Sequence, residues 1–140
     1  MGIALCLYKA GNCLNVSEWI EEAMAVFNFN SKRVLDNSYL QHREAMIESG
    51  FCHGTIGLIF IFHQIYSRTN QTPFAESFKY WNQLFIDSFE KSGGLWQYSN
   101  ENLEWQCNWN LLEGNIGIAL ALLELEGKTS GIVSKLFLIK

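Results

Sequence analysis

The sequence contains little proline and no strongly charged segment. Of its 140 residues one is proline, Pro73, and 10 lysines and arginines face 14 aspartates and glutamates, for a net charge of −4. Because proline interrupts helices, its scarcity leaves long segments free to be helical. The lack of a Lys/Arg cluster is not typical of nucleic-acid-binding proteins, so we expect no nucleic-acid partner.

Long hydrophobic runs are also missing. The apolar stretch at residues 56–62 is much shorter than the roughly 20 residues that span a bilayer. The first residues show no basic region followed by a cleavage site. The four cysteines have no disulfide-framework spacing; they are Cys6, Cys13, Cys52 and Cys107. We therefore expect no membrane insertion, reduced thiols and a cytoplasmic location.

The sequence is rich in apolar and aromatic residues, and their spacing is helical. Hydrophobic residues make up 49% of the chain, including five Trp and ten Phe, enough for one packed all-α domain. Outer, amphipathic helices are predicted to start at Ser17 and at Thr72-Pro73. Inner helices are predicted at residues 2–10 (ending at Gly11), 54–66 and 111–125, a short helix at 41–49, an aromatic loop at 95–109, and an apolar C-terminal tag at 136–139.

An internal repeat supports this alternation of inner and outer helices. Similar segments recur at an interval of about 55 to 60 residues, which is typical of helical solenoids and closed helical rings. They are Gly2-Ile3-Ala4-Leu5, Gly57-Leu58-Ile59-Phe60 and Gly117-Ile118-Ala119-Leu120. A Gly-x-x-Gly pattern precedes the last two, with Gly54 and Gly57 in one and Gly114 and Gly117 in the other. We predict that these glycines are structural and let the starts of inner helices crowd together.

Cys52 and His53 are the candidate metal ligands. A thiolate and an imidazole are the donors that zinc prefers, and here they stand side by side immediately before Gly54. The alternative interpretation is a buried cysteine beside a hydrogen-bonded histidine. His63, in the inner helix, is expected to be a core or interface residue. The remaining cysteines are small hydrophobes unless one moves in as a third ligand. The aromatic loop either packs on the outer layer or forms a carbohydrate or peptide platform.

Taken together, these motifs resemble the last repeats of the lanthionine synthetase C-like (LanC) family, the cyclases of lanthipeptide biosynthesis. The resemblance lies in the order and spacing of three segments: Gly2 to Gly11, Cys52-His53-Gly54-Thr55-Ile56-Gly57, and Leu111 to Leu120. It implies an α/α toroid, a double-layered ring of seven helical hairpins. Residues 1–140 would then be the C-terminal part of such a domain, truncated at the N-terminus, contributing the last hairpins.

The resemblance also implies a chemistry. Cys52 and His53 match two of the three zinc ligands of the family, whose third is a cysteine in a Trp-Cys-Tyr-Gly-type motif just before the segment matched by Gly2-Ile3-Ala4; here Met1 occupies that place. Zinc would activate a cysteine thiol of a dehydrated precursor peptide, and the thiolate would add to dehydroalanine or dehydrobutyrine to form a (methyl)lanthionine thioether.

The family's candidate acid/base residues lie in earlier repeats, so no residue of this chain is assigned a catalytic role. We expect the isolated chain to be inactive and to bind zinc weakly or not at all. It is expected to self-associate or pair with an upstream fragment. The alternatives are a LanC-like protein that binds thiols such as glutathione without cyclising a peptide, and an inactive fragment that needs a partner chain.

Overall fold

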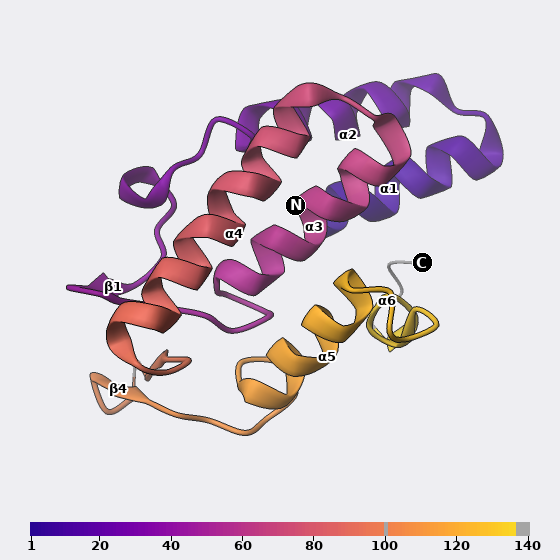
Figure 1. Ribbon diagram of the computed structural model, residues 1–140. Helices are drawn as coiled ribbons and strands as arrows, with labels where there is room; N and C mark the ends of the chain where they lie inside the picture. The colour runs from indigo at the N-terminus through magenta and orange to yellow at the C-terminus, as the bar shows by residue number, and fades with distance from the viewer. Residues whose placement is uncertain (100, 137–140) are drawn as a thin grey trace.

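The chain folds into three successive helical hairpins (Figure 1). The computed structural model describes residues 1–99 and 101–136. The helices are α1 (Gly2–Leu14), α2 (Ser17–Asn30), α3 (Thr55–Thr69), α4 (Thr72–Ser92), α5 (Asn115–Leu125) and α6 (Ile132–Leu136). A short 3₁₀ helix, Leu35–Asn37, follows α2. The prediction of an all-α fold is confirmed, because the strands that accompany these helices are short antiparallel pairs.

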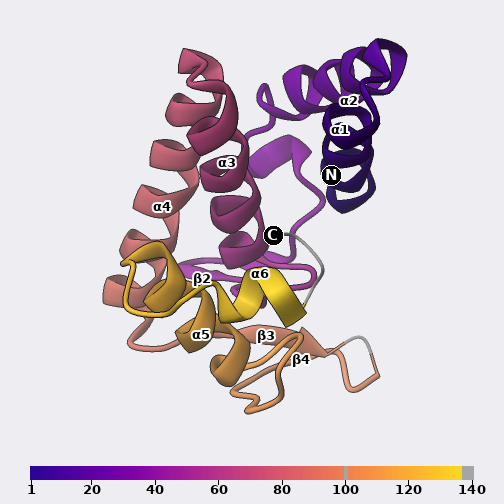
Figure 2. The same ribbon diagram turned by 90° about the vertical axis from the view of Figure 1, so that its right-hand side faces the viewer.

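The helices form two layers, as the alternation of inner and outer helices predicts. The first helices of the hairpins are neighbours, since α3 contacts both α1 and α5. The second helices meet through Phe27 of α2 and Phe74 of α4, whose rings are 6.3 Å apart and nearly perpendicular. Figure 2 shows the α1–α2 and α5–α6 hairpins on different sides of α3. None of the described helices has the length and apolarity needed to cross a membrane.

The most buried helix is α3, as its apolar composition predicts. Seven of its residues are buried, and Ile56, Ile59, Phe60 and Phe62 are completely inaccessible. Outer helix α4 presents Phe74, Trp81 and Phe85 to the core, whereas Phe89 at its end is 49% exposed. Complete burial of side chains of this size is worth roughly 2 to 3 kcal/mol each, so the α3–α4 interface is the centre of the fold.

The predicted end of the first helix at Gly11 is wrong. Helix α1 continues to Leu14, and Asn15 terminates it in the left-handed conformation with φ 57°. Gly11 instead serves the packing of α1 on α2, because a Cβ atom there would lie 2.8 Å from Ile20 Cγ1 and 3.0 Å from the Val16 carbonyl oxygen. Other predicted boundaries hold within a few residues, including the starts of α2 at Ser17 and of α4 at Thr72.

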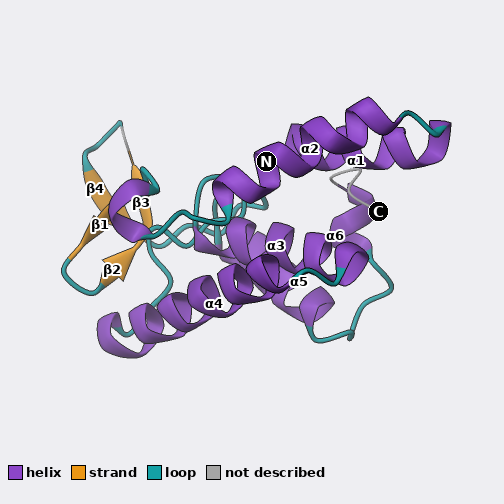
Figure 3. Ribbon diagram, turned by 90° about the horizontal axis from the view of Figure 1, so that it is seen from above, coloured by secondary structure: helices purple, strands orange, loops and turns teal. Residues whose placement is uncertain are grey.

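Two β-hairpins precede α3 and α5, and one of them replaces a predicted helix. Strands β1 (His42–Arg43) and β2 (Met46–Ile47) pair antiparallel where a short helix at residues 41–49 was expected. Strands β3 (Gln97–Ser99) and β4 (Glu104–Gln106) form the second hairpin. Figure 3 shows the four strands gathered at one end of the helices.

The C-terminal part is described only to Leu136. Helix α6 was not predicted; Glu124 of α5 anchors it by accepting hydrogen bonds from the Val133 amide, at 2.7 Å, and from the Ser134 amide. Most of the apolar tag predicted at residues 136–139 lies outside the described residues. Its first member, Leu136, is the last residue of α6 and is 55% exposed.

Candidate metal-binding site

The internal repeat is visible as two loops with the same backbone path. We call residues 48–54 the Cys-His loop and residues 108–114 the Leu-Glu loop. In the first, the Thr55 amide donates to the Glu48 carbonyl at 2.9 Å; in the second, the Asn115 amide donates to the Asn108 carbonyl at 2.7 Å. Each loop therefore closes on the first residue of the helix that follows it, and Cys52 and His53 occupy the positions of Leu112 and Glu113.

Four glycines let each loop fold tightly onto its helix. A Cβ atom on Gly57 would overlap the Phe51 carbonyl oxygen, and one on Gly117 would overlap the Leu111 carbonyl oxygen. A Cβ atom on Gly54 would overlap the backbone of Gly50, and one on Gly114 would overlap the backbone of Asn110. The crowding thus comes from the preceding loop of the same repeat, where we had expected another inner helix, because the loop turns back across the first turn of the helix.

The two loops also contact each other. The Cys52 amide donates a hydrogen bond to the Leu112 carbonyl at 2.8 Å. A Cβ atom on Gly50 would lie 2.7 Å from the Glu113 carbonyl oxygen, so the side-chain-free residue lets the loops meet. The Ser49 amide and hydroxyl both donate to the Trp96 carbonyl, at 2.9 and 2.7 Å. The backbone at the candidate ligands is therefore held by two later segments of the chain.

Cys52 and His53 lie in a pocket of about 240 Å³ and are both solvent-exposed. The alternative of a buried cysteine in this position is therefore excluded. The pocket wall comes from the start of α1, the turn after α2, the Cys-His loop and the first turns of α3. Its lining residues are Met1, Gly2, Arg33, Ser38, Leu40, Cys52, His53, Gly54, Gly57, Leu58 and Ile61.

These residues fit a metal site only in part. A thiol and an imidazole are suitable zinc donors, and both are accessible in the pocket. Among residues 1–99 and 101–136, however, no group of three or more His, Cys, Asp or Glu side chains could hold a metal ion. Catalytic zinc is held by three protein ligands. Cys52 and His53 would supply two of them, and the described residues place no third ligand beside them.

Two carboxyl groups, Glu48 and Glu113, lie near the candidate ligands, and the pKa of Glu48 responds to both loops. Burial raises the pKa of Glu48 above its usual value, and the negative charge of Glu113 raises it further; His53 and a backbone hydrogen bond at Gln41 act in the opposite direction. His53 and Glu113 occupy equivalent positions in the two loops; His53 lowers the pKa of Glu48 and Glu113 raises it. Glu48 and Glu113 also line a polar cavity of about 310 Å³.

The other candidates lie apart from this pocket. Cys6, Cys13 and Cys107 are exposed free thiols and do not line it. His63 is half-buried, as expected for an interface residue: its ring lies 5.4 Å from that of Phe78 on α4, and burial lowers its pKa.

The aromatic loop packs partly on the outer layer. The Trp96 indole donates to Ser92 Oγ of α4 at 3.0 Å, and the rings of Tyr98 and Trp105 meet at 5.5 Å across the second hairpin. Trp109, however, is 69% exposed.

Sequence reasoning missed Arg33 as a member of the pocket. It lies in the turn between α2 and the 3₁₀ helix, within a polar stretch whose path the hydrophobic spacing could not predict. Its position in the sequence carries no signal of its own, because nothing local indicates that this turn folds back toward Cys52.

Comparison with known protein families gives a match over almost the whole chain. The family model described as lanthionine synthetase C-like protein matches residues 1–138. Neither the curated proteins nor the solved structures yield a match.

Proposed function

Because the chain belongs to the lanthionine synthetase C-like family, we propose that its Cys-His loop supplies two zinc ligands, Cys52 and His53, to a site that binds peptide cysteine thiols. When bound, zinc would act as a Lewis acid that lowers the pKa of a coordinated thiol. The chain's own contribution is to hold the two donors in place through the Cys52 amide and the Ser49 side chain.

The proposed reaction is the cyclisation of a dehydrated precursor peptide. A peptide cysteine thiol loses its proton, and its sulfur forms a bond to the β-carbon of dehydroalanine or dehydrobutyrine. The carbon–carbon double bond opens and the α-carbon takes up a proton, which yields a (methyl)lanthionine thioether. No described residue of this chain is assigned to the proton transfers, so the groups that perform them would come from outside it.

One observation carries the proposal: Cys52 and His53 share their pocket with Met1 and Gly2 at the start of α1. The resemblance places the third ligand of the family just before this segment. A cysteine in a segment joined there, or presented there by another chain, would face the other two donors. We infer that such a donor completes the zinc site.

The test is to supply that donor. The chain is extended at its N-terminus with Trp-Cys-Tyr-Gly, and a matched control is extended with Trp-Ser-Tyr-Gly. Cobalt(II), whose thiolate complexes absorb light, is titrated into both and then displaced with zinc. We expect the cysteine extension to bind cobalt at least tenfold more tightly than the serine extension, which corresponds to about 1.4 kcal/mol.

Variants of the extended chain assign the donors. Cys52→Ala and His53→Ala should each abolish the gain in affinity, whereas Cys107→Ala, which removes an exposed thiol outside the pocket, should leave it intact. Equal cobalt affinity in the two extended chains, or a gain that survives Cys52→Ala, would refute the proposed site. The cobalt-loaded protein can then be offered a cysteine peptide or glutathione, and a spectral change with glutathione alone would favour the thiol-binding alternative over cyclisation.

A further inference from the structure

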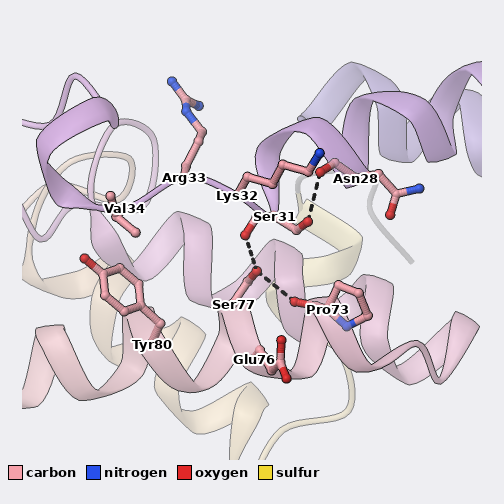
Figure 4. Close-up of a pocket in the computed structure, with 9 residues that line it drawn as sticks. All are labelled: Asn28, Ser31, Lys32, Arg33, Val34, Pro73, Glu76, Ser77 and Tyr80. Atoms are coloured by element: carbon pink, nitrogen blue, oxygen red, sulfur yellow. Dashed lines mark hydrogen bonds between the residues drawn. The ribbon is translucent and has the colours of Figure 1, made fainter.

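Arg33 is a charged side chain that the proposed zinc chemistry does not use. It lines the Cys-His pocket and also an adjacent cavity of about 560 Å³ between the turn after α2 and the first half of α4. Figure 4 shows its guanidinium directed away from Ser77 and Glu76, the α4 residues of that second cavity. The positive charge of Arg33 therefore points away from Glu76, the carboxylate that lines this second cavity.

The guanidinium is held in position by neutral acceptors. One of its terminal nitrogens donates to Asn30 Oδ1 at 3.0 Å and the other to the Ser38 carbonyl at 3.2 Å. Its central carbon lies 5.9 Å from the centre of the Tyr39 ring. These two hydrogen bonds fix the orientation of the guanidinium. Because an arginine has five N–H donors, the others remain available to a ligand. In residues 1–99 and 101–136 no carboxylate forms an ion pair with it.

The pocket that Arg33 shares with Cys52 and His53 has no acidic lining residue. Its remaining wall is made of apolar side chains, glycines and Ser38. A partly desolvated cation in such a pocket attracts an anion, and a guanidinium binds a carboxylate through two parallel hydrogen bonds.

We propose that Arg33 binds a carboxylate of the ligand whose thiol is presented to Cys52 and His53. This inference rests on the proposed function for the thiol, but the attraction of an anion to the pocket does not require metal. It makes Arg33 a residue that selects ligands with a negative charge close to their sulfur, either an acidic residue of a peptide or a carboxylate of a small thiol compound.

The test uses Cys52 itself as the probe. The rates at which anionic iodoacetate and neutral iodoacetamide alkylate each cysteine are measured by mass spectrometry of the metal-free chain. The ratio of the two rates cancels differences in thiol reactivity and reports the local attraction for an anion. We expect the ratio at Cys52 to fall about threefold in Arg33→Gln, as for the loss of one nearby charge in a partly solvated pocket.

Internal and matched controls accompany this measurement. Cys107 is exposed and outside the pocket, so its ratio should not change. Arg33→Lys keeps the charge without the fork and should give an intermediate ratio. If Arg33→Gln loses the native fold, the salt dependence of the wild-type chain replaces it, because the ratio at Cys52 should fall with ionic strength more steeply than the ratio at Cys107.

Competition distinguishes the two sources of the carboxylate. S-methylglutathione, its diethyl ester, and the peptides acetyl-Ala-Glu-Ala-amide and acetyl-Ala-Gln-Ala-amide are tested for slowing the iodoacetate reaction at Cys52. Protection by the glutathione derivative but not its ester indicates a small-molecule carboxylate, and protection by the glutamate peptide alone indicates an acidic peptide.

An unchanged Cys52 ratio in a folded Arg33→Gln chain, or equal protection by charged and neutral competitors, would overturn the proposal. A failed cobalt experiment together with a changed ratio would instead remove the zinc proposal and leave the anion site standing.

Discussion

The Cys-His and Leu-Glu loops have the same backbone closure and different side chains. Both end in glycines that pack against the preceding backbone, and both close on the helix with the same hydrogen bond. Only the first carries the candidate zinc ligands Cys52 and His53; the second has Leu112 and Glu113 at the equivalent positions. The Gly-x-x-Gly pattern is therefore a requirement of the loop–helix junction. The Cys52-His53 pair is not part of that requirement, because it is present in only one of the two loops.

The loops also differ in the acceptors to which their backbone amides donate hydrogen bonds. In the Cys-His loop the Gly54 amide donates to the Gly50 carbonyl at 2.9 Å. In the Leu-Glu loop the Gly114 amide donates to the side chain of Asn110 at 3.0 Å, which also accepts from the Glu113 amide at 2.7 Å. An asparagine could not replace Gly50, because the Glu113 carbonyl occupies the space. The contact between the loops thus imposes the asymmetry.

The largest expected effect comes from breaking the shared backbone. Gly57→Ala and Gly117→Ala each place a methyl group on a carbonyl oxygen, and rigid backbone cannot move away as a side chain would. We expect each to lower the free energy of unfolding by about 3 kcal/mol or more, measured by urea denaturation. Gly2→Ala, whose Cβ atom would have no neighbour within 4 Å, is the matched control and should change stability little. Normal stability of Gly57→Ala would contradict the assigned role of these glycines.

A second prediction compares how much the first turns of α3 and α5, the helices that follow the two loops, contribute to stability. Ile56 of α3 is completely buried, whereas its equivalent in α5, Ile116, is 48% exposed. Ile56→Ser should cost about 3 kcal/mol through the lost burial and the unpaired hydroxyl, and Ile116→Ser less than about 1 kcal/mol. Urea denaturation of both variants measures the difference.

The exposed side of α5 should also drive self-association of the isolated chain. Ile116 and Leu123, at 48% and 45% exposure, belong to an apolar surface of the kind that associates in water. Sedimentation velocity is expected to show concentration-dependent oligomers that the Ile116→Ser/Leu123→Ser double variant reduces. A monomeric wild-type chain at high concentration would show that this surface does not associate.

The smallest expected effect on stability comes from Glu48, whose pKa depends on residues of both loops. Since the folded state raises the pKa of Glu48 above 4.5, its charge is less favourable in the folded than in the unfolded chain. Stability contributed by the neutral form is fully present below pH 4.5 and is lost as the pH rises through the folded pKa. Glu48→Gln should therefore be more stable than wild type at pH 7, with the difference vanishing below pH 4.5.

Glu113→Gln provides the comparison between the loops. It removes a charge that raises the pKa of Glu48, so it should stabilise the chain in the same pH range by less than Glu48→Gln does. Melting temperatures measured between pH 3 and pH 8 give both profiles. A stabilisation that is the same at pH 3 and pH 7 would mean that another property of the substitutions, and not the titration of Glu48, is responsible.

Much of the fold could be predicted from local patterns. The helical spacing of apolar residues identified α3, α4 and the paired layers, and the repeat identified the glycines at the loop–helix junctions. The predicted cap at Gly11 and the predicted helix at residues 41–49 were wrong. In both cases the outcome depends on tertiary contacts: Gly11 faces Ile20, and Ala45, in the turn of the strand pair, accepts a hydrogen bond from the Ser88 hydroxyl of α4 at 2.8 Å.

The candidate site could be predicted only as far as its contiguous pair. Cys52 and His53 are adjacent in the sequence, so their proximity needs no knowledge of the fold. Arg33 and Met1 reach the same pocket from separate segments, and no spacing rule connects them to Cys52. The influence of Glu113 on Glu48 likewise depends on how the two repeats stack.

The hydrogen bond between the Cys52 amide and the Leu112 carbonyl determines which substitutions the contact between the loops tolerates. Because its acceptor is backbone, it forms whatever side chain residue 112 carries, and that side chain is 48% exposed. Position 112 can therefore be substituted while the Cys-His loop stays anchored. The two loops stay joined through backbone atoms, so their side chains can differ, as Cys52 and Leu112 do, without loss of this hydrogen bond.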